Sequence, residues 1–163
     1  MANTYLTKTF STTGNRKTFT FSWWIKRVGV GGSGYFISGM SGSIEFNMFF
    51  DSSGRFGIDD YNGSYGFQLR TNRVFKDPSA WYHFVLAFDT TQGTSTNRIK
   101  LYINGTQYTW DNQTTYPSQN YDTQTNVNGR VLEIGRLGGS YNTAYADMCL
   151  SHVHFIDGTV YDP

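Results

Sequence analysis

The segment DPSAWYHFVLAFD, residues 77–89, has the alternation of an extended strand that is apolar on both sides. Successive residues of a β-strand face opposite sides of the sheet. One face would carry Tyr82, Phe84, Leu86 and Phe88, and the other Trp81, His83, Val85 and Ala87. This pattern predicts a central strand that is covered on both sides or whose second face forms the floor of a groove. His83 is therefore interpreted as a core or groove histidine, and not as a catalyst.

Composition indicates that the rest of the 163-residue chain is also β-structure. Aromatic residues make up 18% and glycines number 18, whereas glutamate occurs only as Glu45 and Glu133. The pair Asn104-Gly105 between two alternating runs predicts a two-residue hairpin. Strands are expected over residues 18–27, 34–40, 43–50, 55–60, 65–75, 81–89, 98–103, 106–110, 131–137 and 147–158, with a long surface loop over 111–129. The predicted fold class is all-β, with two antiparallel sheets packed face to face.

Charge and hydropathy exclude several classes of function. The formal net charge is +1, and no basic run exceeds two residues, so we expect no nucleic-acid partner. No apolar segment approaches the ~20 residues of a membrane-spanning helix, and the N-terminus lacks the layout of a signal peptide. Cys149 has no partner for an internal disulfide. Strict alternation would point it away from His152 and His154, which predicts a buried apolar thiol.

The titratable residues do not predict a metal or catalytic centre. His152 and His154 are two apart on an expected strand, and His83 could add a third nitrogen for zinc. An i, i+2 pair is equally typical of a half-exposed face, and no Asp or Cys is expected on that face nearby, so no metal site is predicted. Asp59-Asp60, just before Tyr61, is interpreted as turn chemistry.

Several segments together resemble the concanavalin A-like lectin/glucanase jelly roll in its laminin-G-like branch: TFTFSWWIKR, WYHFVLAFDTT, IKLYING, LEIGR and HFIDG. RKTFTFSWWIKR, VFKDPSAWYHF, TYPSQNYD and VHFIDGT are similar to segments of tail-fibre and other virion proteins of marine bacteriophages. The resemblance implies an all-β, antiparallel two-sheet jelly-roll β-sandwich over residues 1–163. It also implies one domain of a longer, multimeric protein on the phage particle surface. It implies no particular activity, since this fold hosts sugar binders, glycan-cleaving enzymes, protein-binding modules and passive virion parts.

The resemblance sharpens the expectations for sites. Glycan-cleaving relatives carry an E-x-D-x-x-E strand, and neither Glu45 nor Glu133 lies in that pattern, so we expect a non-enzymatic protein. The family usually keeps a tryptophan at the position of Trp24, which implies that Trp24 is structural and Trp23 the local choice, although either could line a concave sheet. Related domains often bind calcium through acids at a sheet rim, a role open to Asp51, Asp89, Asp122 and Asp147. Because no calcium loop of fixed spacing is present, no cofactor is predicted.

Aromatic and amide side chains are concentrated in the expected loops. Aromatic faces bind the C–H patches of sugars while polar side chains bond the hydroxyls. The predicted ligand-binding residues are Tyr61, Tyr65, Trp110, Asn112, Tyr116, Asn120, Tyr121 and Tyr141. The sequence therefore predicts a virion domain that binds host-surface glycan. Two alternatives stay open: an architectural virion protein whose loops contact neighbouring virion subunits, and a glycan depolymerase with unusual carboxylates.

Overall fold

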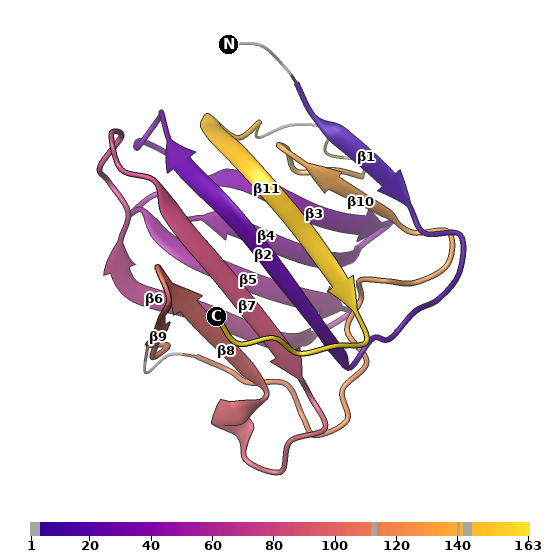
Figure 1. The fold of residues 1–163 in the computed structure, drawn as a ribbon. Coiled ribbons are helices and arrows are strands. Elements are labelled where there is room, and N and C mark those ends of the chain that lie inside the picture. Colours follow the sequence, from indigo (N-terminus) through magenta and orange to yellow (C-terminus); the bar gives the residue numbers. More distant parts are fainter. Residues whose placement is uncertain (1–3, 112–113, 140, 142–144) are drawn as a thin grey trace.

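The computed structural model describes residues 4–111, 114–139, 141 and 145–163 and shows two antiparallel sheets packed face to face (Figure 1). One sheet has six strands in the order β1-β10-β3-β4-β5-β6, and the other has five in the order β11-β2-β7-β8-β9. The elements are β1 (Leu6–Thr9), β2 (Thr18–Arg27), β3 (Gly34–Ser41), β4 (Ile44–Phe50), β5 (Arg55–Asn62), β6 (Tyr65–Val74), β7 (Tyr82–Asp89), the 3₁₀ helix η1 (Ser95–Asn97), β8 (Ile99–Ile103), β9 (Thr106–Tyr108), β10 (Val131–Ile134) and β11 (Met148–Asp157). The predicted fold class is confirmed.

Two sequence signals are directly visible in the backbone. Asn104 and Gly105 turn β8 into β9 with φ values of 52° and 80°, so the predicted hairpin is confirmed. In the described part of the chain, no helix is long and apolar enough to cross a membrane.

An aromatic core joins the two sheets. β2 turns every second residue from Phe19 to Ile25 inward, as its alternation predicts. Trp23 stacks on Phe84 of β7 with ring centroids 5.3 Å apart and contacts Phe36 of the other sheet at 5.6 Å. Its neighbour Trp24 faces outward. The structural role assigned to Trp24 was therefore wrong: Trp23 is the core residue, because successive residues of a strand cannot share one core.

The second face of β7 is covered along half its length by the segment that follows β11 (Figure 1). Val160 of this segment packs on Val85, Ala87 and Tyr102. The hydroxyl of Tyr102 donates to a carboxylate oxygen of Asp162 at 2.6 Å. The other half of the face stays open, so both arrangements predicted for this strand occur, one at each end.

The segment 111–129, predicted as a surface loop, closes one end of the sandwich where it is described. Residues 123–126 are buried. The hydroxyl of Tyr121 and the backbone N–H of Gln124 donate to the two carboxylate oxygens of Asp60, at 2.7 and 2.6 Å. Asp60 is fully buried within β5 and does not lie in the predicted turn. Residues 123–126 of the loop are thus part of the packed interior, and the loop is bonded to Asp60 as well as to Thr90 and Arg16.

β11 contains a β-bulge that the sequence did not reveal. Its pairing with β2 shifts register between Ser151 and His154, and His152 has a φ of 50°. An extra residue exchanges the inward and outward sides along a strand. Consequently Leu150 and Val153 pack against the core, whereas Cys149 is exposed. The predicted burial of Cys149 is wrong for this reason.

Candidate functional site

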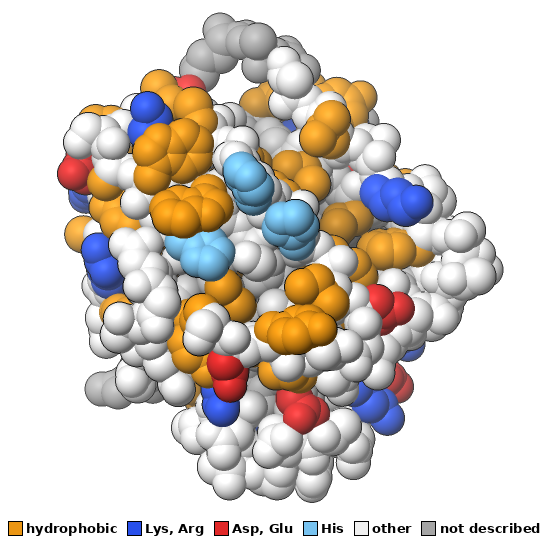
Figure 2. Space-filling model, in the orientation of Figure 1, with side chains coloured by type: hydrophobic (Ala, Val, Ile, Leu, Met, Phe, Trp, Pro, Cys, Tyr) orange, Lys and Arg blue, Asp and Glu red, His pale blue; other side chains and the backbone are white. Residues whose placement is uncertain are grey.

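An open hollow of about 400 Å³ lies on the outer face of the five-stranded sheet. It is lined by Trp24 of β2, Trp81 just before β7, and Ser151 and His152 of β11. The two tryptophans are 41% and 42% exposed. Figure 2 shows this face, where the histidines gather beside large apolar side chains. A volume of this size is within the range of pockets for small ligands.

Trp24 is held in place by a histidine on the neighbouring strand. Cross-strand pairing sets Trp24 between His83 of β7 and Ser151 of β11. The indole and imidazole rings stack with centroids 5.0 Å apart and an interplanar angle of 22°. His83 is itself fixed by a 3.0 Å hydrogen bond between its Nε2 and the hydroxyl of Ser22, and by its backbone N–H, which donates to the Asn104 side chain at 2.8 Å. The exposed face of Trp24 is therefore oriented before any ligand arrives.

Burial favours the neutral form of the His83 imidazole. Partial removal from water disfavours the charged form and lowers the pKa of His83 below its ordinary value. A neutral imidazole can stack flat against an indole and still hydrogen-bond through its edge. His83 therefore serves as a positioning residue for Trp24, consistent with its predicted place in a groove.

Lys26 adds a positive charge beside the second tryptophan. Its ammonium nitrogen lies 5.7 Å from the ring centroid of Trp81. An exposed cation–π contact of this kind contributes ~0.5–1 kcal/mol. Lys26 pairs across the strands with Cys149, which places the exposed thiol on the same face. The hollow thus has two indole walls with a cation at one side.

The bulge in β11 directs His152 into the hollow. Its Nδ1 lies 2.6 Å from the hydroxyl of Ser151, and its ring lies 6.4 Å from that of His154. A positive φ at a residue other than glycine costs about 1–2 kcal/mol. Strained backbone of this kind is often found at binding sites, where the surrounding structure holds it. The bulge therefore brings His152 and Ser151 together at the wall of the hollow, where strict alternation would have placed them on opposite faces.

Metal binding gains no support from the geometry. Among the residues that the structure describes, no three His, Cys, Asp or Glu side chains are grouped to hold an ion. Of the four acids considered for calcium, Asp51 is bonded by Arg55 at 2.9 Å, and Asp89 is bonded by Gln92 at 2.6 Å. The carboxylate oxygens of Asp51 and Asp89 thus already accept hydrogen bonds that stabilise turns.

The residues predicted for ligand binding do not converge on one site. The structure corrects the prediction that Trp110 contacts ligand, because this residue lies in the core and is only 6% exposed. Its indole Nε1 donates to the Ile99 carbonyl at 3.0 Å. Tyr116 and Tyr121 are half-buried against the same core, because the loop that carries them folds into the end of the sandwich. Asn120 is an exposed turn residue with a φ of 60°.

The remaining predicted residues lie elsewhere. Tyr141 is exposed, and Asn112 lies outside the described residues. Tyr61 and Tyr65 meet on the six-stranded sheet with ring centroids 5.1 Å apart. The sequence-based prediction of ligand-binding residues did not include those that line the hollow. A signal for two of them was present in the alternation of TFTFSWWIKR and AWYHF. If Trp23 and Phe84 face the core, Trp24 and Trp81 lie on the opposite faces of their strands.

Comparison with known families agrees with the geometry of the sandwich. The laminin-G-type sequence model of the concanavalin A-like lectin/glucanases superfamily matches residues 2–159. The chain belongs to this superfamily. A search of curated proteins found no match for this concanavalin A-like chain.

Solved structures show the same concanavalin A-like fold. The heptameric SAP-like pentraxin of Limulus polyphemus matches with a TM-score of 0.61 and 18% identity over 93% of this chain and 68% of that one. Domains LG4-5 of the mouse laminin α1 chain match with a TM-score of 0.66 and 13% identity over 97% and 40%. Domain 4 of a GH43 arabinanase from Geobacillus stearothermophilus, in complex with arabinotriose, matches with 0.55 and 11% identity over 91% and 64%. This concanavalin A-like chain therefore spans less than half of the laminin structure.

The hollow of this concanavalin A-like domain provides two indole faces, one hydroxyl and one imidazole, and its lining residues include no carboxylate. Elsewhere, Glu133 is buried in an ion pair with Arg136, at 2.8 and 3.0 Å. Most glycoside hydrolases cleave the glycosidic bond with two carboxyl groups that flank it. The chemistry available at the hollow is stacking and hydrogen bonding.

Proposed function

We propose that this domain binds carbohydrate without cleaving it, and that the sugar lies in the hollow between Trp24 and Trp81. The observation that carries the proposal is the pair of half-exposed indoles beside a polar, bulge-directed His152. The C–H face of a pyranose is apolar and stacks on an aromatic ring, while its hydroxyls need hydrogen-bonding partners. His152 and Ser151 offer those partners at the wall of the hollow.

We further propose that the domain belongs to the surface of a bacteriophage particle, on a tail fibre or as a capsid decoration, where it meets glycan of the host cell. Support comes from the similarity of RKTFTFSWWIKR and VHFIDGT to segments of phage virion proteins. A shallow site of this size binds weakly by itself. Many copies on one particle would raise the overall avidity by orders of magnitude, ~10²–10⁴ for linked sites.

Glycan-array screening followed by calorimetry tests the binding function. Trp24→Ala and Trp81→Ala should each weaken binding of the selected glycan by about 10-fold or more, since a buried aromatic contact contributes ~1.4 kcal/mol or more. Tyr161→Ala is the matched control, because Tyr161 is an exposed aromatic outside the hollow. Equal losses in all three variants would contradict the proposed site.

The alternatives predict other outcomes. Release of reducing sugar from host glycan would favour a depolymerase. If no glycan binds and a map of the assembled particle shows Trp24 and Trp81 buried against a neighbouring subunit, the domain is architectural.

A further inference from the structure

A second set of polar and aromatic side chains lies on the outer face of the six-stranded sheet, on the other side of the core from the hollow. Cross-strand pairing aligns Glu45 of β4 with Tyr61 of β5, and Tyr61 with Tyr65 of β6. The adjacent row aligns Asn47 of β4 with Asp59 of β5. These five residues are called the β4–β6 cluster.

Asn47 carries an unused acceptor at the base of this cluster. It is 2% exposed and lies on the side of β4 opposite the core residues Phe46 and Met48. Its Nδ2 donates to Glu45 at 2.8 Å, but in the described part of the chain its Oδ1 has no hydrogen-bond partner. A buried polar atom without a partner is destabilising. A ligand that brings an N–H or O–H donor would satisfy it.

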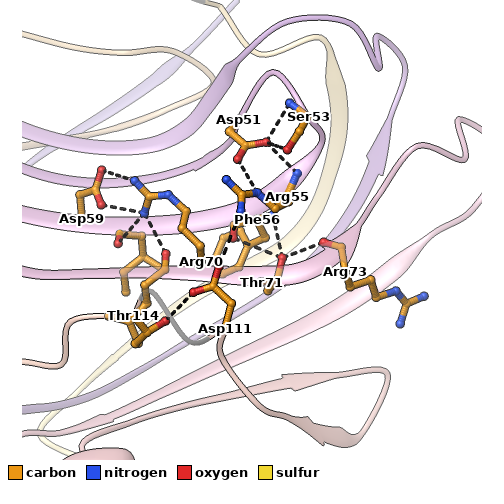
Figure 3. Close-up of polar contacts among 12 residues, drawn as sticks. Asp51, Ser53, Arg55, Phe56, Asp59, Arg70, Thr71, Arg73, Asp111 and Thr114 are labelled. Atoms are coloured by element: carbon orange, nitrogen blue, oxygen red, sulfur yellow. Dashed lines mark hydrogen bonds and ion pairs between the residues drawn. The ribbon is translucent and has the colours of Figure 1, made fainter.

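The charge of the cluster is negative. Asp59 is neutralised by Arg70 through two hydrogen bonds, of 2.7 and 3.0 Å (Figure 3). Arg70 also lies 4.5 Å from the ring centroid of Phe49, which fixes its position. No Lys or Arg of the described residues forms an ion pair with Glu45. One carboxylate of the cluster therefore stays uncompensated.

Aromatic rings border this carboxylate. Tyr61 and Tyr65 meet edge to face, and Tyr65 is 54% exposed. Burial raises the pKa of Tyr65, and the charges of Asp59 and Glu45 raise it further, while Arg70 opposes this. Ring faces beside a carboxylate attract a desolvated ammonium by cation–π and Coulomb forces together.

From this arrangement we propose that the β4–β6 cluster binds a saccharide that carries a free primary amine. The ammonium contacts the Glu45 carboxylate beside the rings of Tyr61 and Tyr65, and ligand hydroxyls bond Asn47 Oδ1 and Asp59. The row of hydroxyl partners next to the aromatic row favours an amino sugar over a lysine side chain, whose stem is apolar. The site goes beyond the proposed function, since it uses the opposite sheet and a different ligand group.

Oligomers of glucosamine and of N-acetylglucosamine of equal length test the proposal, because acetylation converts the charged amine into a neutral amide and leaves the sugar ring and its hydroxyls unchanged. Titration of ¹⁵N-labelled protein at pH 6 should show binding of the free amine and at least 10-fold weaker binding of the acetylated oligomer. The side-chain amide resonance of Asn47 should shift on binding. Equal affinity for the two oligomers would overturn the proposal.

Variants locate the effect. Glu45→Gln keeps an acceptor for Asn47 but removes the charge, and it should weaken amine binding at least 10-fold. Asp122→Asn removes an exposed charge outside the cluster and should change nothing. Tyr65→Phe should stay within about 2-fold of the wild type, while Tyr65→Ala should lose about 5-fold, since the ring is the source of the cation–π attraction. Equal effects of Glu45→Gln and Asp122→Asn would contradict the site.

Trp24→Ala separates this inference from the proposed function. It should leave binding of the amine oligomer unchanged while it weakens binding of the glycan in the hollow. Loss of amine binding in Trp24→Ala would assign the amine to the hollow and overturn the proposal for the β4–β6 cluster.

Discussion

Trp23 and Trp24 are neighbours in sequence with opposite environments. Trp23 is buried between the sheets and contacts rings from both, whereas Trp24 stacks on His83 at the surface. Alternation assigns the pair to opposite faces and places Trp23 on the apolar face of β2, whereas the family resemblance implied that Trp24 was the structural residue. Which ring is internal depends on which side of β2 the six-stranded sheet covers.

Substitution of each tryptophan should separate stability from binding. Trp23→Ala should lower the free energy of unfolding by ~3–5 kcal/mol, the cost of removing a large buried ring. Trp23→Phe should cost less, because the indole Nε1 of Trp23 has no acceptor in the described structure and the substitution removes that unpaired donor. Trp24→Ala should stay within ~1 kcal/mol of the wild type. Urea denaturation measures all three, and equal losses for Trp23→Ala and Trp24→Ala would contradict the assigned faces.

At the scale of the element, the bulge in β11 sets what the five-stranded sheet presents to solvent. It moves Cys149 outward together with Ser151 and His152, whereas strict alternation would have separated the thiol from the histidines. The strand that closes the sheet is thereby also the strand that lines the hollow.

Backbone conformation at His152 should respond to the shape of its side chain. His152→Val should lower the free energy of unfolding by ~1–2 kcal/mol, because a β-branched residue is disfavoured at positive φ. His152→Gly should leave stability unchanged or raise it by up to ~1 kcal/mol. Both should weaken glycan binding. If His152→Gly were less stable than His152→Val in thermal denaturation, the positive φ would be contradicted.

At the scale of the whole molecule, the open end of the sandwich is closed by a loop that docks on one carboxylate. Burial raises the pKa of Asp60 to about 6, although hydrogen bonds from Gln124 and Tyr121 and the charges of Arg130 and Arg16 oppose this. The folded state therefore binds the proton more tightly than the unfolded state. Asp60 thus contributes most to stability below its unfolded pKa of 3.8, and this contribution is lost as pH rises through about 6.

The difference in stability between the wild type and Asp60→Asn should accordingly depend on pH. We expect the wild type to lose ~2.4 kcal/mol relative to Asp60→Asn between pH 4 and pH 7, because the pKa of Asp60 rises from 3.8 in the unfolded chain to about 6 in the folded protein. Other acids, such as Asp51, titrate in both proteins and cancel in the difference. Urea denaturation at the two pH values measures it, and a constant difference would show that Asp60 is not buried as described.

The sequence by itself predicted every strand except β1, together with the hairpin at Asn104-Gly105 and the sandwich, because alternation and turn chemistry are local properties of the chain. The exposed residues Leu6–Thr9 of β1 lack the apolar alternation that reveals the other strands. The sites needed the tertiary structure. A loop rich in tyrosine and asparagine has the same composition whether it binds sugar or, like residues 123–126, fills the end of a sandwich. Likewise, one inserted residue in β11 reverses every later side chain, and only its pairing with β2 reveals it. Burial and register depend on contacts between segments far apart in the sequence. Those contacts decided which of the two apolar faces of β7 became core, and where the outer face of the sheet became the wall of a hollow.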